Sequence, residues 1–212
     1  MYDLLMRLPL LGWGSVAATV QIAGLIQLMS AKSADFVYAI HIATRLSTIS
    51  LLLLVAAAVI LRTRPSGKAS GLEPRLAALL GSFTMYGILL FPRHDLSLSG
   101  EISATLLMII GNVGAVVALS QLGRSFSVMA ETRQLVTTGP YRFVRHPLYL
   151  AEEIAIAGVF LQFASLWTGL ILLVQIVCQL RRMHNEELVL TARFPEYSAY
   201  RGRTSRLVPG VY

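Results

Sequence analysis

The chain has 212 residues, of which 55% are hydrophobic and only 14% are charged. Soluble domains carry about 25% charged residues, so this composition, with a mean hydropathy of +0.65, excludes an ordinary soluble domain and indicates a membrane protein. The net charge of +7 does not indicate nucleic-acid binding, because the basic residues border the apolar runs, as in the inside loops of membrane proteins.

Six apolar runs follow one another along the chain, at about residues 8–29, 36–61, 76–91, 102–122, 148–163 and 165–180. We expect helices throughout, because backbone polar groups in hydrocarbon must bond within their own segment. About 20 apolar residues cross a bilayer core, so the first, second and fourth runs are comfortable spans and the third is short. The last two are shorter still, and the short break between them at Ala164 and Ser165 predicts a helical hairpin.

The predicted fold is therefore an all-α integral membrane protein with about six transmembrane helices. Residues 1–122 are expected to hold the N-terminal transmembrane helices, and residues 123–212 a C-terminal catalytic region with a loop, the hairpin and a tail. The linkers 62–75 and 123–147 and the tail carry most of the arginines, which places them and the N-terminus in the cytoplasm. Six crossings satisfy this pattern, whereas five would require one run to be a surface helix.

Residues 138–152 form the most informative segment of the sequence. Gly139 and Pro140 mark a turn, and Pro147 fits the first turn of a following helix. Arg145 and His146 then lie where free backbone N–H groups and a positive helix end meet the membrane surface. Such a place can hold a polar ligand beside an apolar one.

A second cluster follows the predicted hairpin. Arg182 and Glu186 are four residues apart, so they share one helix face just beyond an apolar helix. Taken alone, the pair is more typical of a solvated ion pair among arginines that reach toward the membrane surface.

Together these segments resemble the isoprenylcysteine carboxyl methyltransferase family and related membrane-bound methyltransferases. The resemblance covers about residues 137–212 and lies in the order of the motifs on either side of the hairpin. The resembling positions are residues 139–149, then Arg182, Glu186, Glu187, Phe194, Tyr197 and Tyr200, and finally residues 206–209. Pro195 stands where the family commonly has glycine.

The resemblance implies methyl transfer from S-adenosylmethionine (SAM) to a lipophilic or prenylated acceptor among the membrane lipids, at the cytoplasmic surface. It implies that SAM contacts Tyr141, Arg145, His146, Pro147, Tyr149, Leu150 and Glu187. It implies catalytic roles for Arg182 and Glu186 at the reacting end, with Arg206 binding the acceptor. No protein partner is predicted, and the roles of Glu152 and Glu153 stay unassigned.

The chemistry of the residues is compatible with this resemblance. The sequence has no Gly-x-Gly-x-x-Gly, so SAM would bind outside a Rossmann sheet. The four histidines and one cysteine show no metal-ligand spacing, and we expect no metal. A carboxylate acceptor needs an arginine to position it, whereas an amine must lose a proton to a nearby base. The residues allow both, and the family resemblance favours the carboxylate of an isoprenylcysteine-like substrate over a phospholipid amine.

Two other functions stay open. Membrane sterol reductases have a tail like residues 206–212 and would use NADPH, although the chain looks short for them, and a non-catalytic scaffold is also compatible. His41 and Arg45 share a face inside the second run, where ionisable residues indicate either a structural polar contact or a polar cavity.

Overall fold

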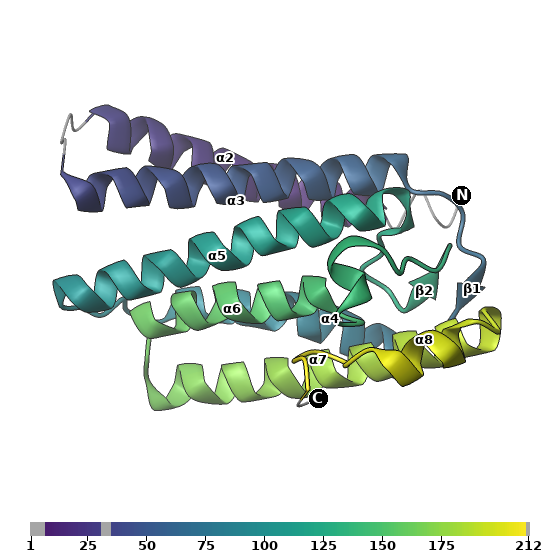
Figure 1. Cartoon of the computed structure of the whole chain (residues 1–212). Helices are drawn as coiled ribbons and strands as arrows, with labels where there is room; N and C mark the ends of the chain where they lie inside the picture. The colour runs from purple at the N-terminus through teal and green to yellow at the C-terminus, as the bar shows by residue number, and fades with distance from the viewer. Residues whose placement is uncertain (1–6, 31–34, 211–212) are drawn as a thin grey trace.

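The computed structural model describes residues 7–30 and 35–210. Within them the chain is a bundle of long helices, α2 (Arg7–Ser30), α3 (Phe36–Leu61), α4 (Glu73–Phe83), α5 (Leu98–Leu122), α6 (Pro147–Gln162) and α7 (Leu166–Arg193), with a short α8 (Tyr197–Arg203) (Figure 1). The 3-10 helices are η1 (Thr84–Leu90), η2 (Gly123–Ser125) and η3 (Gly139–Arg142). The strands β1 (Gly67–Lys68) and β2 (Glu131–Thr132) pair antiparallel. The predicted all-α membrane fold is confirmed.

Local chemistry sets where these helices begin. The side chains of Asp35 and Ser97 accept hydrogen bonds from the N–H groups of the first turns of α3 and α5. Ser165 and Thr168 form a reciprocal capping box at the start of α7. Gly123, with φ of 47°, follows the end of α5 in a conformation that glycine tolerates best.

The count of six crossings stays a prediction. In the described ranges, four helices are long and apolar enough to span a membrane: Leu8–Ser30, Phe36–Leu61, Leu98–Ser125 and Leu166–Arg193. Helix α6 has 16 residues, and the third run is split between an 11-residue α4 and a 7-residue 3-10 continuation. Both are shorter than the roughly 20 residues that cross a bilayer core.

The C-terminal hairpin differs in detail from the sequence prediction. Helices α6 and α7 run antiparallel through a short turn, but α6 packs mainly on α5, and α7 mainly on α4 (Figure 1). Helix α7 continues through the predicted tail to Arg193, so Arg182 and Glu186 belong to the same helix as the apolar run. The sequence could not show this, because the change from apolar to polar residues does not interrupt helix propensity.

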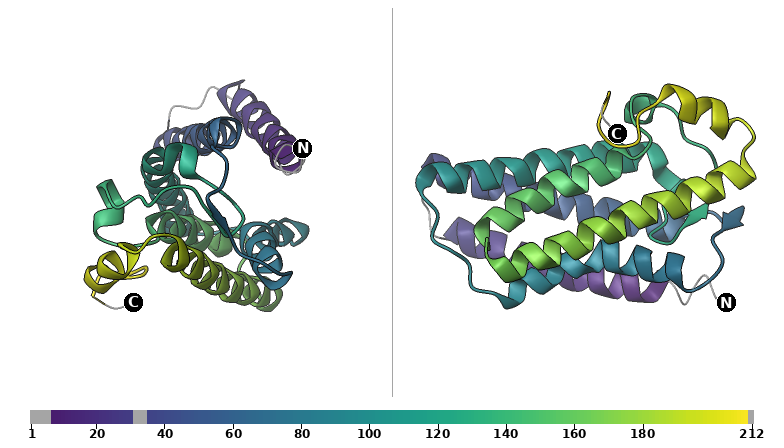
Figure 2. Two further views of the ribbon diagram at one scale, coloured as in Figure 1. Left: turned by 90° about the vertical axis from the view of Figure 1, so that its right-hand side faces the viewer. Right: turned by 90° about the horizontal axis from the view of Figure 1, so that it is seen from below.

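The predicted basic linkers and tail meet at one end of the bundle. Pairing of Gly67 with Thr132 joins the linker 62–75 to the linker 123–147, and a bridge between Val144 and Ser205 joins that linker to the tail. Figure 2 shows these segments crossing the ends of the helices. This end, called the loop end below, also contains a buried cluster in which Leu119, Tyr149 and Met183 take part.

The polar residues in the second run make structural contacts. The His41 ring lies 3.2 Å from the carboxylate of Glu101, and Arg45 donates to Gln21 at 3.2 Å. Asn112 of α5 donates to Thr48 of α3 at 2.8 Å, which is an interhelical bond of the predicted kind. These contacts support a structural role for His41 and Arg45, and neither residue lines the pocket at the loop end.

Candidate active site

The segment 138–147, here called the His–Pro loop, leads into α6 at the loop end. Gly139, with φ of 59°, opens the 3-10 turn η3 in a left-handed conformation that favours glycine. His146 directly precedes the helix, and Pro147 is its first residue, where the missing N–H has no intrahelical partner to lose. The predicted turn and helix start are both present.

The C-terminal tail holds this loop in place. The N–H of Arg145 donates to the carbonyl of Ser205 at 2.9 Å, and the N–H of His146 donates to the carbonyl of Arg206 at 3.1 Å. The Arg145 guanidinium also donates to the carbonyl of Arg201 at 3.1 Å and to that of Thr204. Backbone hydrogen bonds thus join the His–Pro loop to a segment about 60 residues later in the sequence.

Glu187 is the electrostatic centre of this arrangement. One of its carboxylate oxygens lies 2.9 Å from Nε of Arg145, 3.2 Å from Nε2 of His146 and 3.3 Å from Nε of Arg206. Removing a single partner from such a buried group leaves an uncompensated charge and is strongly destabilising. Glu187 and Arg206 therefore fix the loop to α7, and the ligand contacts that the family resemblance implies for them stay predictions.

A second polar cluster lies beside the first, on the same two helices. The Tyr149 hydroxyl donates to Glu186, and Nε of Arg182 lies 3.4 Å from the same carboxylate oxygen. The guanidinium of Arg182 lies 4.6 Å from the centre of the Tyr149 ring and donates to Ser82 of α4 at 3.0 Å. Arg182 is only 2% exposed, so the charge is held inside the protein by these partners.

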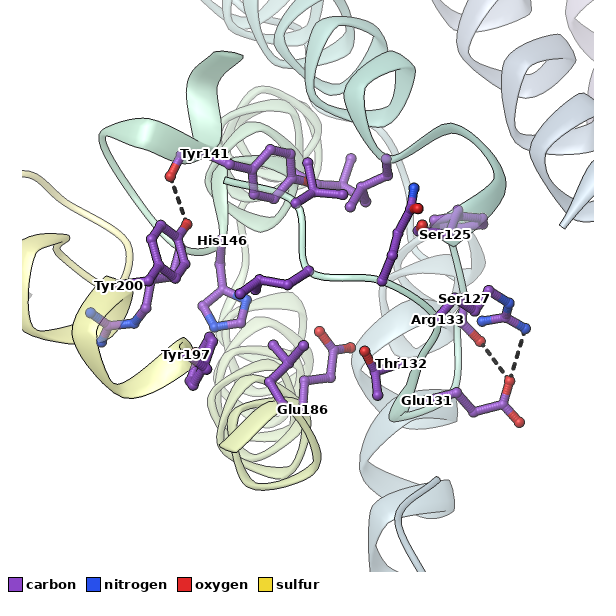
Figure 3. Close-up of a pocket in the computed structure, with 18 of the residues that line it drawn as sticks. Ser125, Ser127, Glu131, Thr132, Arg133, Tyr141, His146, Glu186, Tyr197 and Tyr200 are labelled. Carbon is purple, nitrogen blue, oxygen red and sulfur yellow. Dashed lines mark hydrogen bonds and ion pairs between the residues drawn. The ribbon is translucent and has the colours of Figure 1, made fainter. Parts of the chain in front are cut away.

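A pocket of about 760 Å³, part of it open to solvent, lies over these clusters (Figure 3). Its lining includes Tyr141, Arg145, His146, Tyr149 and Glu186 among the predicted residues. The lining does not include Pro147, Leu150, Arg182, Glu187 or Arg206.

The rest of the pocket lining consists of residues to which the sequence analysis gave no role. They come from the segment 122–136 and from α8, and they include Ser125, Ser127, Thr132, Gln134, Tyr197 and Tyr200. Tyr197 and Tyr200 had been noted only for the resemblance. The one available signal for the segment was its polar serines and glutamine beside an arginine-rich linker, which is typical of any loop.

The tyrosines are hydrogen-bond donors at any physiological pH. Burial raises the pKa of Tyr200 to about 12, and burial also raises the pKa of Tyr141 and Tyr197 well above the usual range. The Tyr200 hydroxyl donates to the carbonyl of Tyr141 at 2.6 Å. Among the described residues, the buried hydroxyls of Tyr197 and Thr132 have no hydrogen-bond partner, and both residues line the pocket.

A row of polar pairs continues from this cluster along α6 and α7. Gln179 donates to Glu152 at 2.9 Å, and Gln175 donates to Glu153 at 2.9 Å. Among the described residues, the side-chain carbonyl oxygens of both glutamines are buried without a partner. The two carboxylates that the sequence left unassigned therefore lie at the interface of α6 with α7. In the described segments no three His, Cys, Asp or Glu side chains gather as a metal site.

Residues 100–196, which contain both clusters, match the family model for phospholipid methyltransferases. This segment is therefore similar to a family that is part of the membrane-bound isoprenylcysteine carboxyl methyltransferase-like superfamily. The match to this superfamily confirms the resemblance seen in the sequence. Within the superfamily, the match does not separate phospholipid acceptors from isoprenylcysteine ones.

Two curated relatives of this methyltransferase-like chain are known as metal resistance proteins. The nickel-cobalt-cadmium resistance protein NccN of Alcaligenes xylosoxydans xylosoxydans is 32% identical over 113 residues, which cover 51% of this chain and 52% of NccN. The cobalt-zinc-cadmium resistance protein CzcN of Cupriavidus metallidurans is 31% identical over 109 residues, 49% of this chain and 50% of CzcN. The chain thus spans about half the length of the curated relatives it matches.

Proposed function

We propose that this protein transfers the methyl group of SAM to a lipophilic acceptor at the membrane surface. The observation that carries the proposal is the pocket between the His–Pro loop and α7, whose lining brings His146, Tyr149 and Glu186 together. The superfamily supports the same chemistry. We further propose that residues 123–212 are the catalytic region and that residues 1–122 form the membrane helices that support it.

The residues of the pocket fit SAM. The rings of His146 and Tyr149 stack at a centroid distance of 5.3 Å, and Tyr141 adds a further aromatic wall. The unpartnered hydroxyls of Tyr197 and Thr132 suit the polar ribose, amino and carboxylate groups of such a ligand. When bound, SAM would supply an activated methyl group on its sulfonium, so the protein mainly has to align donor and acceptor.

Arg182 and Glu186 are proposed to position the acceptor beside this pocket. The reaction breaks the bond between the methyl carbon and sulfur and forms a bond between that carbon and an oxygen or nitrogen of the acceptor. A carboxylate is already ionised, whereas an ammonium must first give a proton to a base within reach. Glu186 can take that proton, because its carboxylate lines the pocket.

The geometry supports a nitrogen acceptor better than a carboxylate. Arg182 is the one arginine in this cluster, and its guanidinium is already engaged by Glu186 and Ser82. Glu152 and Glu153 add two carboxylates nearby, which would repel a second negative charge and attract an amine. The isoprenylcysteine-like carboxylate that the sequence favours stays the second candidate, and Arg182 is the residue that would position it.

The orientation in the membrane is also a proposal. The arginine-rich linkers and the tail meet at the loop end, so we propose that this end and the pocket face the cytoplasm. Single cysteines at positions 66, 97 and 205, in a Cys178→Ser background, test this by labelling from one side. Position 97 should label from the side opposite to the other two. Labelling of all three from the same side would contradict six crossings.

The functional test is methyl transfer from labelled SAM by the purified protein in detergent or in vesicles. We expect transfer to a tailed amine lipid and much slower transfer to the same headgroup without its tail. Prenylcysteine analogues test the carboxylate alternative in the same assay. Equal rates with and without the tail would contradict a lipophilic acceptor, and NADPH binding without SAM binding would support the reductase alternative.

A further inference from the structure

A second pocket lies at the loop end and shares Glu131 with the active-site pocket. It encloses about 540 Å³, which is within the usual size range of small-molecule pockets. Its lining comes from the first turns of α2, from α4, and from residues 128–130 beside β2. The residues of its apolar body are Pro9, Leu10, Trp13, Leu79, Phe83 and Val128.

The mouth of this pocket is basic. Arg62, Lys68 and Arg75 are part of the lining, and Glu131 is the one acid among the lining residues that the structure describes. Glu131 lies 3.5 Å from Lys68 and 3.1 Å from Arg133, so its charge is offset. The pocket mouth therefore carries an excess of positive charge. It lies at the loop end, which the arginine-rich linkers place at a membrane surface.

The body of the pocket is suited to hydrocarbon. Trp13 packs edge-on against Phe83 with ring centroids 5.5 Å apart, and against Tyr86 at 5.0 Å. The rings of Trp13 and Phe83, together with Leu79, form an apolar surface in the pocket. Helix α2 otherwise exposes large apolar side chains such as Val16, Val20 and Ile26, as a helix in contact with lipid does.

We propose that this pocket binds a membrane phospholipid with a net negative headgroup. The headgroup phosphate would meet Arg62, Lys68 and Arg75, and an acyl chain would lie along Trp13 and Phe83. The argument is charge complementarity at the mouth together with an apolar body, a combination that suits basic pockets between transmembrane helices on the cytoplasmic side. The N-terminal helix α2, which carries no sequence motif, thereby gains a function.

The pocket is also a neighbour of the proposed reacting end. Glu131 lines both pockets. Arg182 donates to Ser82 at 3.0 Å and approaches the carbonyl of Ser127 at 3.5 Å. The residues that directly follow these two serines in the chain, Phe83 and Val128, line the second pocket. A lipid bound there would lie close to the residues that contact Arg182, but an anionic headgroup without an amine is not the acceptor proposed above. The lipid binding does not rest on the proposed function.

Tryptophan quenching tests the binding directly. The chain has two tryptophans, so Trp167→Phe leaves Trp13 as the single reporter inside the pocket. The protein is placed in vesicles that contain small, equal amounts of phosphatidylglycerol or phosphatidylcholine with brominated acyl chains. We expect stronger quenching by the anionic lipid. Arg75→Gln should weaken that preference about fivefold, because one basic residue near a membrane surface contributes about 1 kcal/mol.

The matched control is Arg64→Gln, which removes the same charge from an exposed position in the same linker outside the pocket lining. It should keep the preference. Equal quenching of wild-type Trp13 by the two lipids, or equal loss in Arg75→Gln and Arg64→Gln, would overturn the lipid site. Selective quenching without methyl transfer to any lipid would instead leave the site standing and contradict the proposed function.

Discussion

The two faces of α6 differ in how they contact their neighbours. Toward α5 the contact is built from small residues: a Cβ added to Gly111 would lie 2.4 Å from the backbone N of Ala155, and one added to Gly158 would lie 2.4 Å from the carbonyl of Ala104. Toward α7 the contact is built from Tyr149, Glu152 and Glu153 with their polar partners.

The two contacts of α6 suggest different tasks: the contact with α5 stabilises the fold, and the contact with α7 is proposed to serve catalysis. Close backbone approach between small residues is the usual way for membrane helices to pack, and it needs no polar groups. Ionisable residues between membrane helices are costly and usually mark a functional path. Helix α6 therefore has a tight structural contact with α5 on one face. Its other face forms a polar interface with α7 that leads from the pocket toward the membrane.

Substitutions in the polar interface should have the largest effect on catalysis. For Arg182→Ala and Glu186→Ala we expect methyl transfer to fall about 100-fold or more, in the range of lost acid–base and positioning groups. SAM affinity should change much less, because the two residues are proposed to act on the acceptor. The measurement is turnover of labelled SAM alongside its binding affinity.

Arg181→Ala is the matched control for that prediction. It removes the same charge from the neighbouring position, where the side chain is about half exposed and pairs with Glu73 at 3.0 Å. Its activity should stay near wild type. Full activity in the Arg182 and Glu186 variants would mean that the polar interface is structural, and the contrast between the two faces would disappear.

Substitutions in the α5 contact should act on stability instead. Gly158→Ala adds a methyl group where backbone atoms leave no room, and we expect it to cost about 1–3 kcal/mol. Gly169→Ala on α7 is the control, because no atom lies within 4 Å of its added Cβ. Thermal unfolding in detergent should show a lower midpoint for Gly158→Ala only. Identical midpoints in both variants would refute the tight contact.

The smallest expected effect concerns the charge of the polar interface. Glu152→Gln keeps the shape of the side chain and removes one negative charge near Arg182. With an amine acceptor the rate should fall by about tenfold, which corresponds to about 1.4 kcal/mol. With a carboxylate acceptor the same variant should be faster, because a repulsive charge is gone. A rate that rises for the amine would reverse our assignment of the acceptor.

Much of the loop end follows from local sequence. The turn at Gly139, the helix start at Pro147 and the shared face of Arg182 and Glu186 depend on rules that act over a few residues, and all three are present. The apolar runs likewise become helices, because the membrane leaves the backbone few alternatives. The roles of the individual site residues stay predictions.

Other features depend on contacts far apart in the chain. No local pattern shows that Glu187 would bind Arg145 and Arg206 at once, or that Thr132 and Tyr197 would complete the pocket. The packing of α6 on α5 rather than α7 depends on which small residues meet in space, as Gly111 meets Ala155. Hydropathy alone cannot give this, because both faces of α6 are mostly apolar in sequence.

Calorimetric titration with SAM tests the central claim, that the pocket at the His–Pro loop is the methyl-donor site. We expect the wild-type protein to bind SAM in roughly the micromolar range typical of enzyme substrates. His146→Ala and Tyr149→Ala should bind it at least about tenfold more weakly, a loss of about 1.4 kcal/mol. His94→Ala, an exposed histidine outside the pocket, should bind like wild type. Unchanged affinity in folded His146 and Tyr149 variants, or no SAM binding by the wild type, would contradict the account.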